Sequence, residues 1–178
     1  MHAAPIPSEF ETRCNEVFDA LMWALSRPGL RRALPETGAA QIVDALIDRE
    51  CAVWAADPVI IARAEQTGAA LVAPAQADHL FAGALVDADA LRGLRCGSDL
   101  YPDDGATLVV DAQFDTGDAL RVTGPGVDGA ETFRVGGLPD GFWAARAEAM
   151  RYPMGFELFL LSGDQVIGIP RSTKVEVL

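Results

Sequence analysis

The densest group of residues that could bind a charged ligand lies near the C-terminal end of the sequence. Residues 170–174 read Pro-Arg-Ser-Thr-Lys, so Arg171 and Lys174 flank the hydroxyls of Ser172 and Thr173. Two cations and two hydroxyls in this short run suit the oxygens of a phosphate or phosphonate, because arginine can bind two oxygens at once. Charged side chains at a strand end can also serve only to protect an exposed sheet edge. Both interpretations stay open.

Two turn-rich segments earlier in the chain could also contact an anion. Arg27 belongs to residues 26–29, Ser-Arg-Pro-Gly, where a predicted helix ends. A cation in the last helical turn stabilises the helix dipole without any ligand, and this is the favoured interpretation for Arg27. Gly124 and Gly126 flank a proline, and their amides could approach a phosphate closely. The same glycines could simply form a turn, so their signal alone is weak.

One acidic pair could take part in proton transfer or cation binding. Asp48 and Glu50 stand directly before a predicted buried strand. Carboxylates can act as general acid and base, but this pair more simply marks the end of a helix and the start of a strand. Glu50 is therefore kept as a candidate binding residue, without the features of a named catalytic dyad.

The scarcity of lysine excludes several enzyme classes. The only lysine, Lys174, stands between a threonine and a valine, so the chain has neither a Walker A phosphate loop nor the strand lysine of a protein kinase. A pyridoxal phosphate enzyme would have to form its Schiff base at Lys174, four residues from the end of the sequence. We therefore expect no cofactor of this type.

Cysteine and histidine spacing predicts no metal site. Cys14, Cys51 and Cys96 are widely spaced and odd in number, which favours buried free thiols in a reducing cytoplasm over disulfides or an iron–sulfur cluster. His2 and His79 are the only histidines. A zinc site or a Ser-His-Asp triad would have to use His79 without any supporting motif. The expected metal content is none.

Overall charge and hydropathy narrow the range of partners. The 178 residues carry 26 acids against 14 bases, a net charge of −12, and such a surface repels nucleic acid and anionic lipid. No apolar run reaches the roughly 18 residues that a membrane-spanning helix needs, and the first residues do not read as a secretory signal. These features predict one cytoplasmic domain over residues 1–178, with residues 1–7 as a flexible tail.

Hydrophobic periodicity predicts alternating helices and short strands. A long helix is expected from a capping box at Ser8 to a stop at Pro28, and further helices at 39–47, 57–67, 77–81, 89–94 and 139–151. Strands are expected at 51–54, 71–73, 84–86, 106–110, 119–122, 131–135, 156–161, 166–169 and 174–177. Continuous apolar strands between helices favour a parallel sheet covered on both faces. The predicted fold is a single three-layer α/β domain with a mixed, mainly parallel sheet.

Several short segments, taken together and in order, resemble the PhnH subunit of the bacterial carbon–phosphorus lyase system for phosphonate utilisation. The matching segments are residues 26–29, 46–50, 53–54, 101–102, 105–108, 123–127, 142–143, 152–157 and 169–174. Each is unspecific alone, but their order and their spread over nearly the whole chain make the set specific. Glu157 and Ser172 replace the aspartate and threonine usual in the family, and both replacements keep the chemistry.

The resemblance implies a fold similar to that of pyridoxal phosphate-dependent transferases but without the cofactor. It also implies a homodimer that joins PhnG, PhnI and PhnJ in a core complex. That complex couples an alkylphosphonate to the ribose of a nucleoside triphosphate, and a radical iron–sulfur step in PhnJ later breaks the carbon–phosphorus bond. The resemblance brings no assigned catalytic residue, so we expect a subunit that is inactive alone.

Two other functions stay open. A stand-alone enzyme acting on phosphorylated small molecules would use Arg171, Thr173 and Arg27 as anion clamps and Glu50 or Asp48 as base, and it requires a pocket where they converge. A vestigial pyridoxal-fold protein would bind a phosphate ligand at residues 124–126. The subunit interpretation accounts for the whole chain and predicts an exposed apolar patch.

Overall fold

The computed structural model describes residues 6–178, so most of the predicted tail at residues 1–7 lies outside the described residues. Four α-helices occur in this part of the chain: α1 (Glu9–Ser26), α2 (Ala40–Leu46), α3 (Pro58–Thr67) and α4 (Phe142–Ala149). The strands are β1 (Arg31–Ala33), β2 (Ala52–Ala55), β3 (Ala70–Leu71), β4 (His79–Gly83), β5 (Thr107–Asp111), β6 (Gln113–Thr123), β7 (Glu131–Gly136), β8 (Glu157–Ser162), β9 (Gln165–Ile169) and β10 (Lys174–Val177). Short 3₁₀ turns include η2 (Ala88–Gly93). None of the described helices combines the length and apolar character needed to cross a membrane.

Two sheets are present rather than the single predicted sheet. The larger has seven strands in the order β1-β9-β8-β5-β4-β2-β3. Its strands from β8 to β3 are parallel to one another, whereas β9 runs antiparallel to both of its neighbours. The smaller sheet, β10-β6-β7, is antiparallel throughout. The prediction of a mixed, mainly parallel sheet is confirmed, but three of its expected strands form the second sheet instead.

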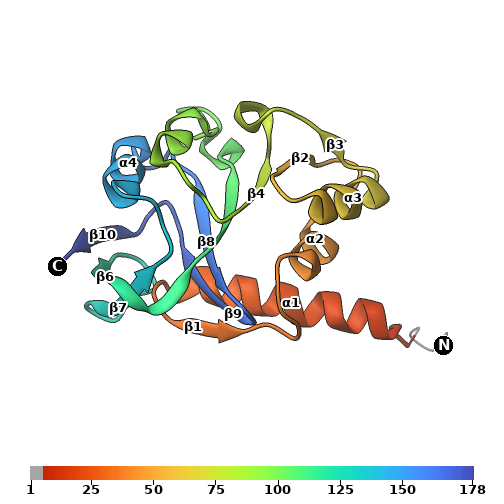
Figure 1. Ribbon diagram of the computed structural model, residues 1–178, viewed down its shortest axis with the longest axis horizontal. Helices are drawn as coiled ribbons and strands as arrows, with labels where there is room; N and C mark the ends of the chain where they lie inside the picture. The colour runs from red at the N-terminus through yellow and green to blue at the C-terminus, as the bar shows by residue number, and fades with distance from the viewer. Residues whose placement is uncertain (1–5) are drawn as a thin grey trace.

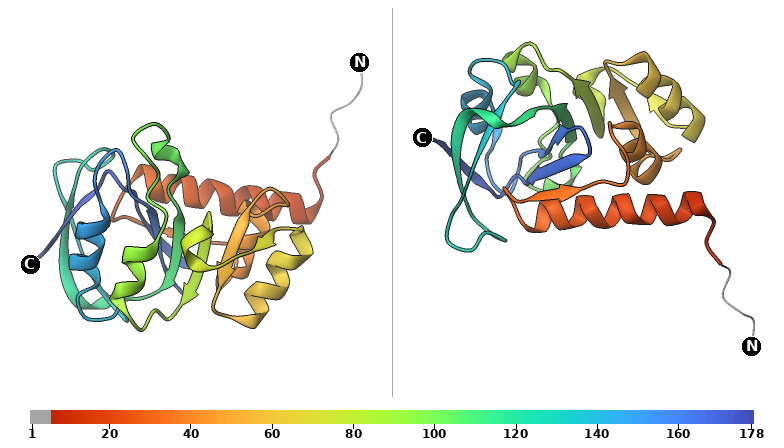
Figure 2. Two further views of the ribbon diagram at one scale, coloured as in Figure 1. Left: turned by 90° about the horizontal axis from the view of Figure 1, so that it is seen from above. Right: turned by 60° about the horizontal axis from the view of Figure 1, so that its bottom comes forward.

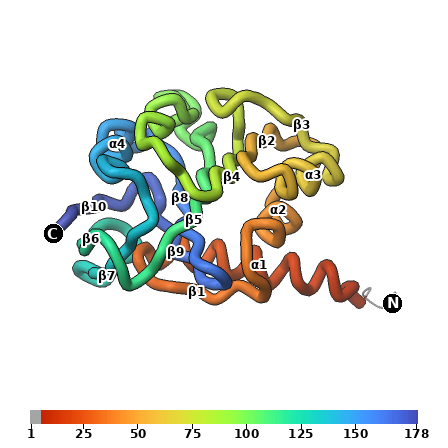
Figure 3. Tube along the Cα trace, viewed as in Figure 1, coloured from red at the N-terminus to blue at the C-terminus, as the bar shows by residue number. Residues whose placement is uncertain are grey.

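Three layers enclose two apolar cores (Figures 1 and 2). On one face of the large sheet, α1, α2 and α3 cover the apolar side chains of the central strands. On the other face, α4, η2 and the small sheet provide the cover. Because both faces are buried, β5 and β8 are apolar almost without interruption. The small sheet and α4 lie at the end of the molecule that holds the C-terminus, and the start of α1 lies at the opposite end (Figure 3).

The helix boundaries follow local capping chemistry. The Ser8 side chain accepts a hydrogen bond from the backbone of Glu11, and the Glu11 carboxylate accepts one from the Ser8 backbone, which is the predicted capping box. Asp57 caps α3, Pro58 occupies its first position, and Gly68 ends it with a left-handed conformation. These predicted boundaries are confirmed.

Two predictions between residues 77 and 86 are wrong. Residues 77–81, expected as a helix, contain the start of the central strand β4, and residues 84–86, expected as a strand, form the loop that follows. A short apolar run does not distinguish a buried strand from a buried helix. Tertiary pairing decides the outcome here, since β4 lies between β2 and β5 with Leu80, Phe81 and Ala82 all buried. The short edge strand β1 was not predicted.

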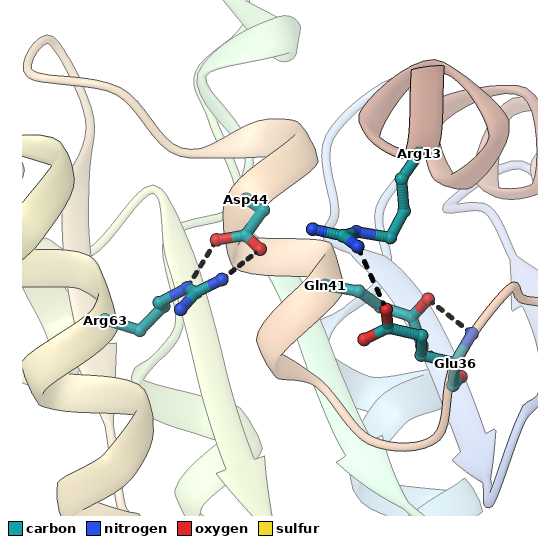
Figure 4. Close-up of polar contacts among 5 residues, drawn as sticks. All are labelled: Arg13, Glu36, Gln41, Asp44 and Arg63. Carbon is teal, nitrogen blue, oxygen red and sulfur yellow. Dashed lines mark hydrogen bonds and ion pairs between the residues drawn. The ribbon is translucent and has the colours of Figure 1, made fainter. Parts of the chain in front are cut away.

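Polar contacts hold the three helices of one face together (Figure 4). Arg63 on α3 binds Asp44 on α2 through two parallel contacts, Nε–Oδ1 and Nη2–Oδ2, each of 2.5 Å. Arg13 on α1 reaches Glu36 at 3.3 Å, and the buried Gln41 accepts a 3.0 Å hydrogen bond from the Glu36 backbone. Bidentate geometry on the largely buried Asp44 makes the α2–α3 pair the strongest of these contacts.

The three cysteines are free within the described chain, as predicted, but they are half-buried rather than buried. Burial raises the pKa of each thiol, which disfavours the reactive thiolate. No group of three His, Cys, Asp or Glu side chains gathers as metal ligands would among residues 6–178.

We expect His79 to make folding stability depend on pH. Burial lowers the pKa of His79 below its ordinary value of about 6.5, although the charges of Asp78 and Asp48 partly oppose this. The unfolded chain therefore binds more protons than the folded chain below about pH 6.5, so stability falls as pH falls through that value. Urea unfolding at pH 7 and pH 5.5 should show this loss, and His79→Gln should reduce it. An equal loss in the variant would contradict this role.

Candidate functional site

A cavity of about 710 Å³ opens between α4 and the loop that joins β9 to β10. Figure 1 shows α4, β10 and the β6–β7 region at this same end of the molecule. The lining residues are Pro125, Trp143, Arg146, Ala147, Met150, Tyr152, Arg171, Ser172, Thr173, Lys174 and Val175. The cavity therefore brings together the predicted residues Arg171, Ser172 and Thr173 with side chains from α4.

Arg171 is anchored by contacts with its own protein. Its backbone N–H donates to Glu157 Oε2 at 2.9 Å, and its Nε lies 3.4 Å from Glu157 Oε1. Its Nη1 also donates to the backbone carbonyl of Pro102. The Arg171 guanidinium thus bridges the start of β8 and the loop before β5 while it lines the cavity. This cation has an internal partner and lines a ligand-sized space, and the two interpretations made from the sequence stay predictions.

Arg146 on α4 is a site residue that the sequence analysis missed. Only 3% of it is exposed, and it donates to two backbone carbonyls, Thr173 O at 3.3 Å from Nη1 and Pro170 O at 3.0 Å from Nη2. No carboxylate within the described residues forms an ion pair with it. Burial lowers the pKa of Arg146 to about 10, with the charge of Glu157 opposing the change. Arg146 therefore stays charged at neutral pH, at a free-energy cost of about 3 kcal/mol.

Three buried polar atoms beside this cavity lack a hydrogen-bond partner within the described chain. They are Arg146 Nε, Thr173 Oγ1 and Trp143 Nε1. Thr173, like Arg146, is 3% exposed, and Trp143 is also buried. Such an atom typically costs about 1–3 kcal/mol when it is left without a partner. Because nearly all buried polar groups in proteins are satisfied, three exceptions around one cavity need a specific explanation.

The charge of the lining is opposite to the charge of the protein. Arg146, Arg171 and Lys174 contribute three cations, and no Asp or Glu of the described chain lines the cavity. The sequence as a whole carries a net charge of −12. A concave region lined by one sign of charge focuses the electrostatic field and attracts ligands of the opposite sign. The site is suited to an anion, and among the described residues no carboxylate or imidazole lines it.

Gly124 and Gly126 are exposed, and each packs closely against another segment of the chain. A Cβ atom on Gly124 would lie 3.0 Å from the backbone oxygen of Ser172, and one on Gly126 would lie 2.3 Å from the backbone oxygen of Ser26. The turn between them is therefore wedged between the end of α1 and the β9–β10 loop. Pro125, which lies between the two glycines, is part of the cavity lining.

Arg27 and Glu50 lie outside the cavity. Arg27 is the residue that ends α1, and it lines a separate hollow of about 490 Å³ that it shares with Gly126 and Glu131. Glu50 is exposed in the turn before β2, where its backbone N–H donates to Asp48 Oδ1 at 2.8 Å. This hydrogen bond lowers the pKa of Asp48. The acidic pair therefore makes a local contact and lies outside the cavity that Arg171 lines.

One sequence signal could have identified Arg146. It stands four residues after Phe142 and three after Trp143, which places a cation on the apolar face of the predicted helix at 139–151. Charged residues are almost never fully buried unless they are partnered. A cation on the face of a helix that packs against the core is therefore a candidate for a buried functional group.

The fold and the cavity define a class of protein: a three-layer α/β chain with a cationic, ligand-sized cavity. Residues 8–176 match the family described as bacterial phosphonate metabolism protein (PhnH), so the chain belongs to the PhnH family. HtxG of Stutzerimonas stutzeri, whose name describes a C-P lyase subunit protein, is 32% identical over 99% of this chain and 95% of its own length. The subunit PhnH of alpha-D-ribose 1-methylphosphonate 5-triphosphate synthase from Rhizobium meliloti is 37% identical over 45% of this chain and 41% of its own.

A Cβ atom at Gly126 should destabilise the protein because it would collide with the backbone of Ser26. Gly126→Ala is expected to lower the free energy of unfolding by more than about 2 kcal/mol. Gly129→Ala is the matched control, since Gly129 has a similar φ of +72° against +82° but open space around its Cβ. Gly129→Ala should lower the free energy of unfolding by only about 1 kcal/mol, the cost of a left-handed conformation for a residue with a Cβ atom. Guanidinium unfolding measures both, and equal losses would contradict the packing role of Gly126.

Proposed function

We propose that this chain is a subunit of a carbon–phosphorus lyase core complex in organophosphonate catabolism. In that role it is required for the coupling of an alkylphosphonate to the ribose of a nucleoside triphosphate. It works in the cytoplasm as a homodimer together with PhnG, PhnI and PhnJ. Family membership and the names of the two relatives support this proposal, since both names refer to subunits of enzymes in phosphonate chemistry.

The residue types that line the cavity are the main structural support for this proposal. Its lining supplies cations and hydroxyls, which bind oxyanions, but no Asp, Glu or His of the described chain that could accept a proton. A site that can hold an anion but has no carboxylate or histidine to act as a base fits a subunit whose chemistry is completed by another chain. This accords with the expectation that the chain is inactive alone.

An exposed apolar face on α1 also supports the proposal that the chain is a subunit of a complex. Phe18 is 49% exposed and Met22 is 51% exposed, and the two lie one helical turn apart on the same face of α1. This α1 face, defined by Phe18 and Met22, lies on a helix at the outside of the molecule (Figure 2). Neighbouring exposed apolar side chains of this size are typical of surfaces that contact another protein.

A stand-alone enzyme of the same fold is the alternative function. The cavity lined by Arg171 and Thr173 favours it, because this volume suits a small molecule. The other parts of that hypothesis are separated from the cavity, with Arg27 at its own hollow and Glu50 in the turn before β2. The alternative would therefore have to use Lys174 or Tyr152 as its acid or base in place of Glu50 or Asp48.

We also infer that the fold is that of a pyridoxal phosphate-dependent transferase that has lost the cofactor. The position of the only lysine supports this, because Lys174 starts the exposed strand β10 rather than lying in the buried sheet. A Schiff-base lysine needs a desolvated amine, and the exposed side chain of Lys174 is not held in that way.

Pyridoxal phosphate should form no lasting covalent adduct with this protein. After incubation and dialysis, the protein should show no absorbance band in the visible range, and Lys174→Met should give the same spectrum. A band that survives dialysis in the original chain and is absent from the variant would contradict the loss of the cofactor.

Co-expression tests the proposed assembly. When the chain alone carries an affinity tag, PhnG, PhnI and PhnJ from the same host should be purified with it in equal amounts and should elute together in size exclusion. Phe18→Ser combined with Met22→Ser should abolish either the homodimer or the recovery of the partners, because the double variant makes the α1 face polar. Val59→Ser is the matched control, since Val59 is 68% exposed on α3, away from the α1 face.

The outcomes of this experiment separate two claims. Elution of the chain as a dimer without PhnG, PhnI or PhnJ would overturn the proposed function. An unchanged complex and dimer in the double variant would leave the function in place and remove the α1 face from its support. Circular dichroism of each variant checks that a lost contact does not come from unfolding.

A further inference from the structure

The three unpartnered atoms at the cavity share one chemical property, which is that all of them can donate a hydrogen bond. Arg146 Nε and Trp143 Nε1 can only donate, and the hydroxyl of Thr173 can donate as well as accept. A ligand that satisfies such a set must supply acceptors. Water could satisfy the hydrogen bonds, but it would leave the buried charge of Arg146 without a counter-charge. An oxyanion provides both the acceptors and the charge.

We propose that this cavity binds the phosphate or phosphonate group of a small molecule, with Arg146, Thr173 and Trp143 beneath it and Arg171 and Lys174 at its sides. That the ligand is a substrate of phosphonate catabolism rests on the proposed function, whereas the binding of an oxyanion does not. The three atoms that lack a partner within the described chain are themselves buried. The anion therefore first meets Arg171 and Lys174 and reaches these atoms after a small side-chain shift.

The other residues that line the cavity indicate the polarity and size of the rest of the ligand. Pro125, Ala147, Met150 and Val175 provide apolar surface, and Tyr152 provides a largely exposed ring. A volume of about 710 Å³ lies within the usual range for small-molecule sites and is much larger than one phosphate group needs. The ligand therefore carries a less polar body beside its anionic group. A nucleoside triphosphate and an alkylphosphonate are the two sources of this chemistry in the proposed reaction.

Arg146 and Arg171 differ in whether their charge is compensated within the protein. Glu157 binds Arg171 directly at 3.4 Å, so this charge is already compensated. Within residues 6–178, the partners of Arg146 are backbone carbonyls, which are dipoles rather than charges. An incoming dianion thus gains most from Arg146 and Lys174. Binding should weaken as salt increases, because the charge of Lys174 is exposed to solvent.

Fluorescence of Trp143 provides a direct test. Trp23→Phe with Trp54→Phe leaves Trp143 as the only tryptophan of the chain. Inorganic phosphate, methylphosphonate and ATP are each titrated into this protein, alone and within the purified complex. We expect at least one of them to change the emission of Trp143 in a saturable way and to raise the melting temperature. Stronger binding of ATP or of methylphosphonate identifies the source of the anion.

Variants locate the site. Thr173→Val and Lys174→Met should each weaken binding by about tenfold or more, because each removes a donor to a charged ligand. Arg146→Lys should weaken it further, and if that variant fails to fold, the other two still decide the question. Arg121→Met is the matched control, since Arg121 is an exposed arginine on the same small sheet that pairs with Glu176. Its affinity should change less than about twofold.

Three outcomes would overturn the proposal. They are the absence of saturable binding of all three probes, affinity unchanged by Thr173→Val and Lys174→Met, and an equal loss with Arg121→Met. None of them depends on the co-elution of PhnG, PhnI and PhnJ. Failure of the anion site and failure of the proposed function are therefore distinguishable.

Discussion

The burial of the Arg146 guanidinium is the constraint on which the geometry of the site depends. Two of its nitrogens hold the carbonyls of Pro170 and Thr173, which fixes the β9–β10 loop against α4. Burial of a charge without a carboxylate partner is costly, so the rest of the fold must stabilise this arrangement. The packing of Phe142 into the core beneath α4 and the pairing of β10 with β6 supply that support. A structural brace alone would not need an unpartnered Nε beside a cavity.

The position of the cavity in the sheet is unusual for an open α/β protein. Ligands of such folds commonly bind at the carboxyl ends of the parallel strands. Here Glu157 and Thr107 are the first residues of β8 and β5, and the Arg171 contacts place the cavity at this amino edge. At the carboxyl edge stand Asp57, after β2, and Asp111, the last residue of β5. Burial and the charge of Asp57 raise the pKa of Asp111. That acidic edge disfavours an anion, whereas the amino edge attracts one.

Sequence reasoning succeeded where local chemistry decides the structure. The capping box at Ser8 and the Asp57–Gly68 boundaries follow from side chains within a few residues of each other, and both were predictable. The identity of β4 and the existence of a second sheet depend on pairing between distant segments, which a single sequence does not encode in any local pattern. The site divides in the same way, because the Arg171 cluster is local in sequence whereas Arg146 joins it only through folding.

Three of the segments that carry the family resemblance pack against one another in the fold. The turn at Gly124 and Gly126 touches the end of α1 on one side and the Ser172 backbone on the other. A side chain at Gly126 would displace the end of α1, since its Cβ has no space beside Ser26. The same turn places Pro125 in the cavity lining. The two glycines, whose amides are candidate phosphate donors in the sequence, therefore also pack against the loop that contains Arg171 and Thr173.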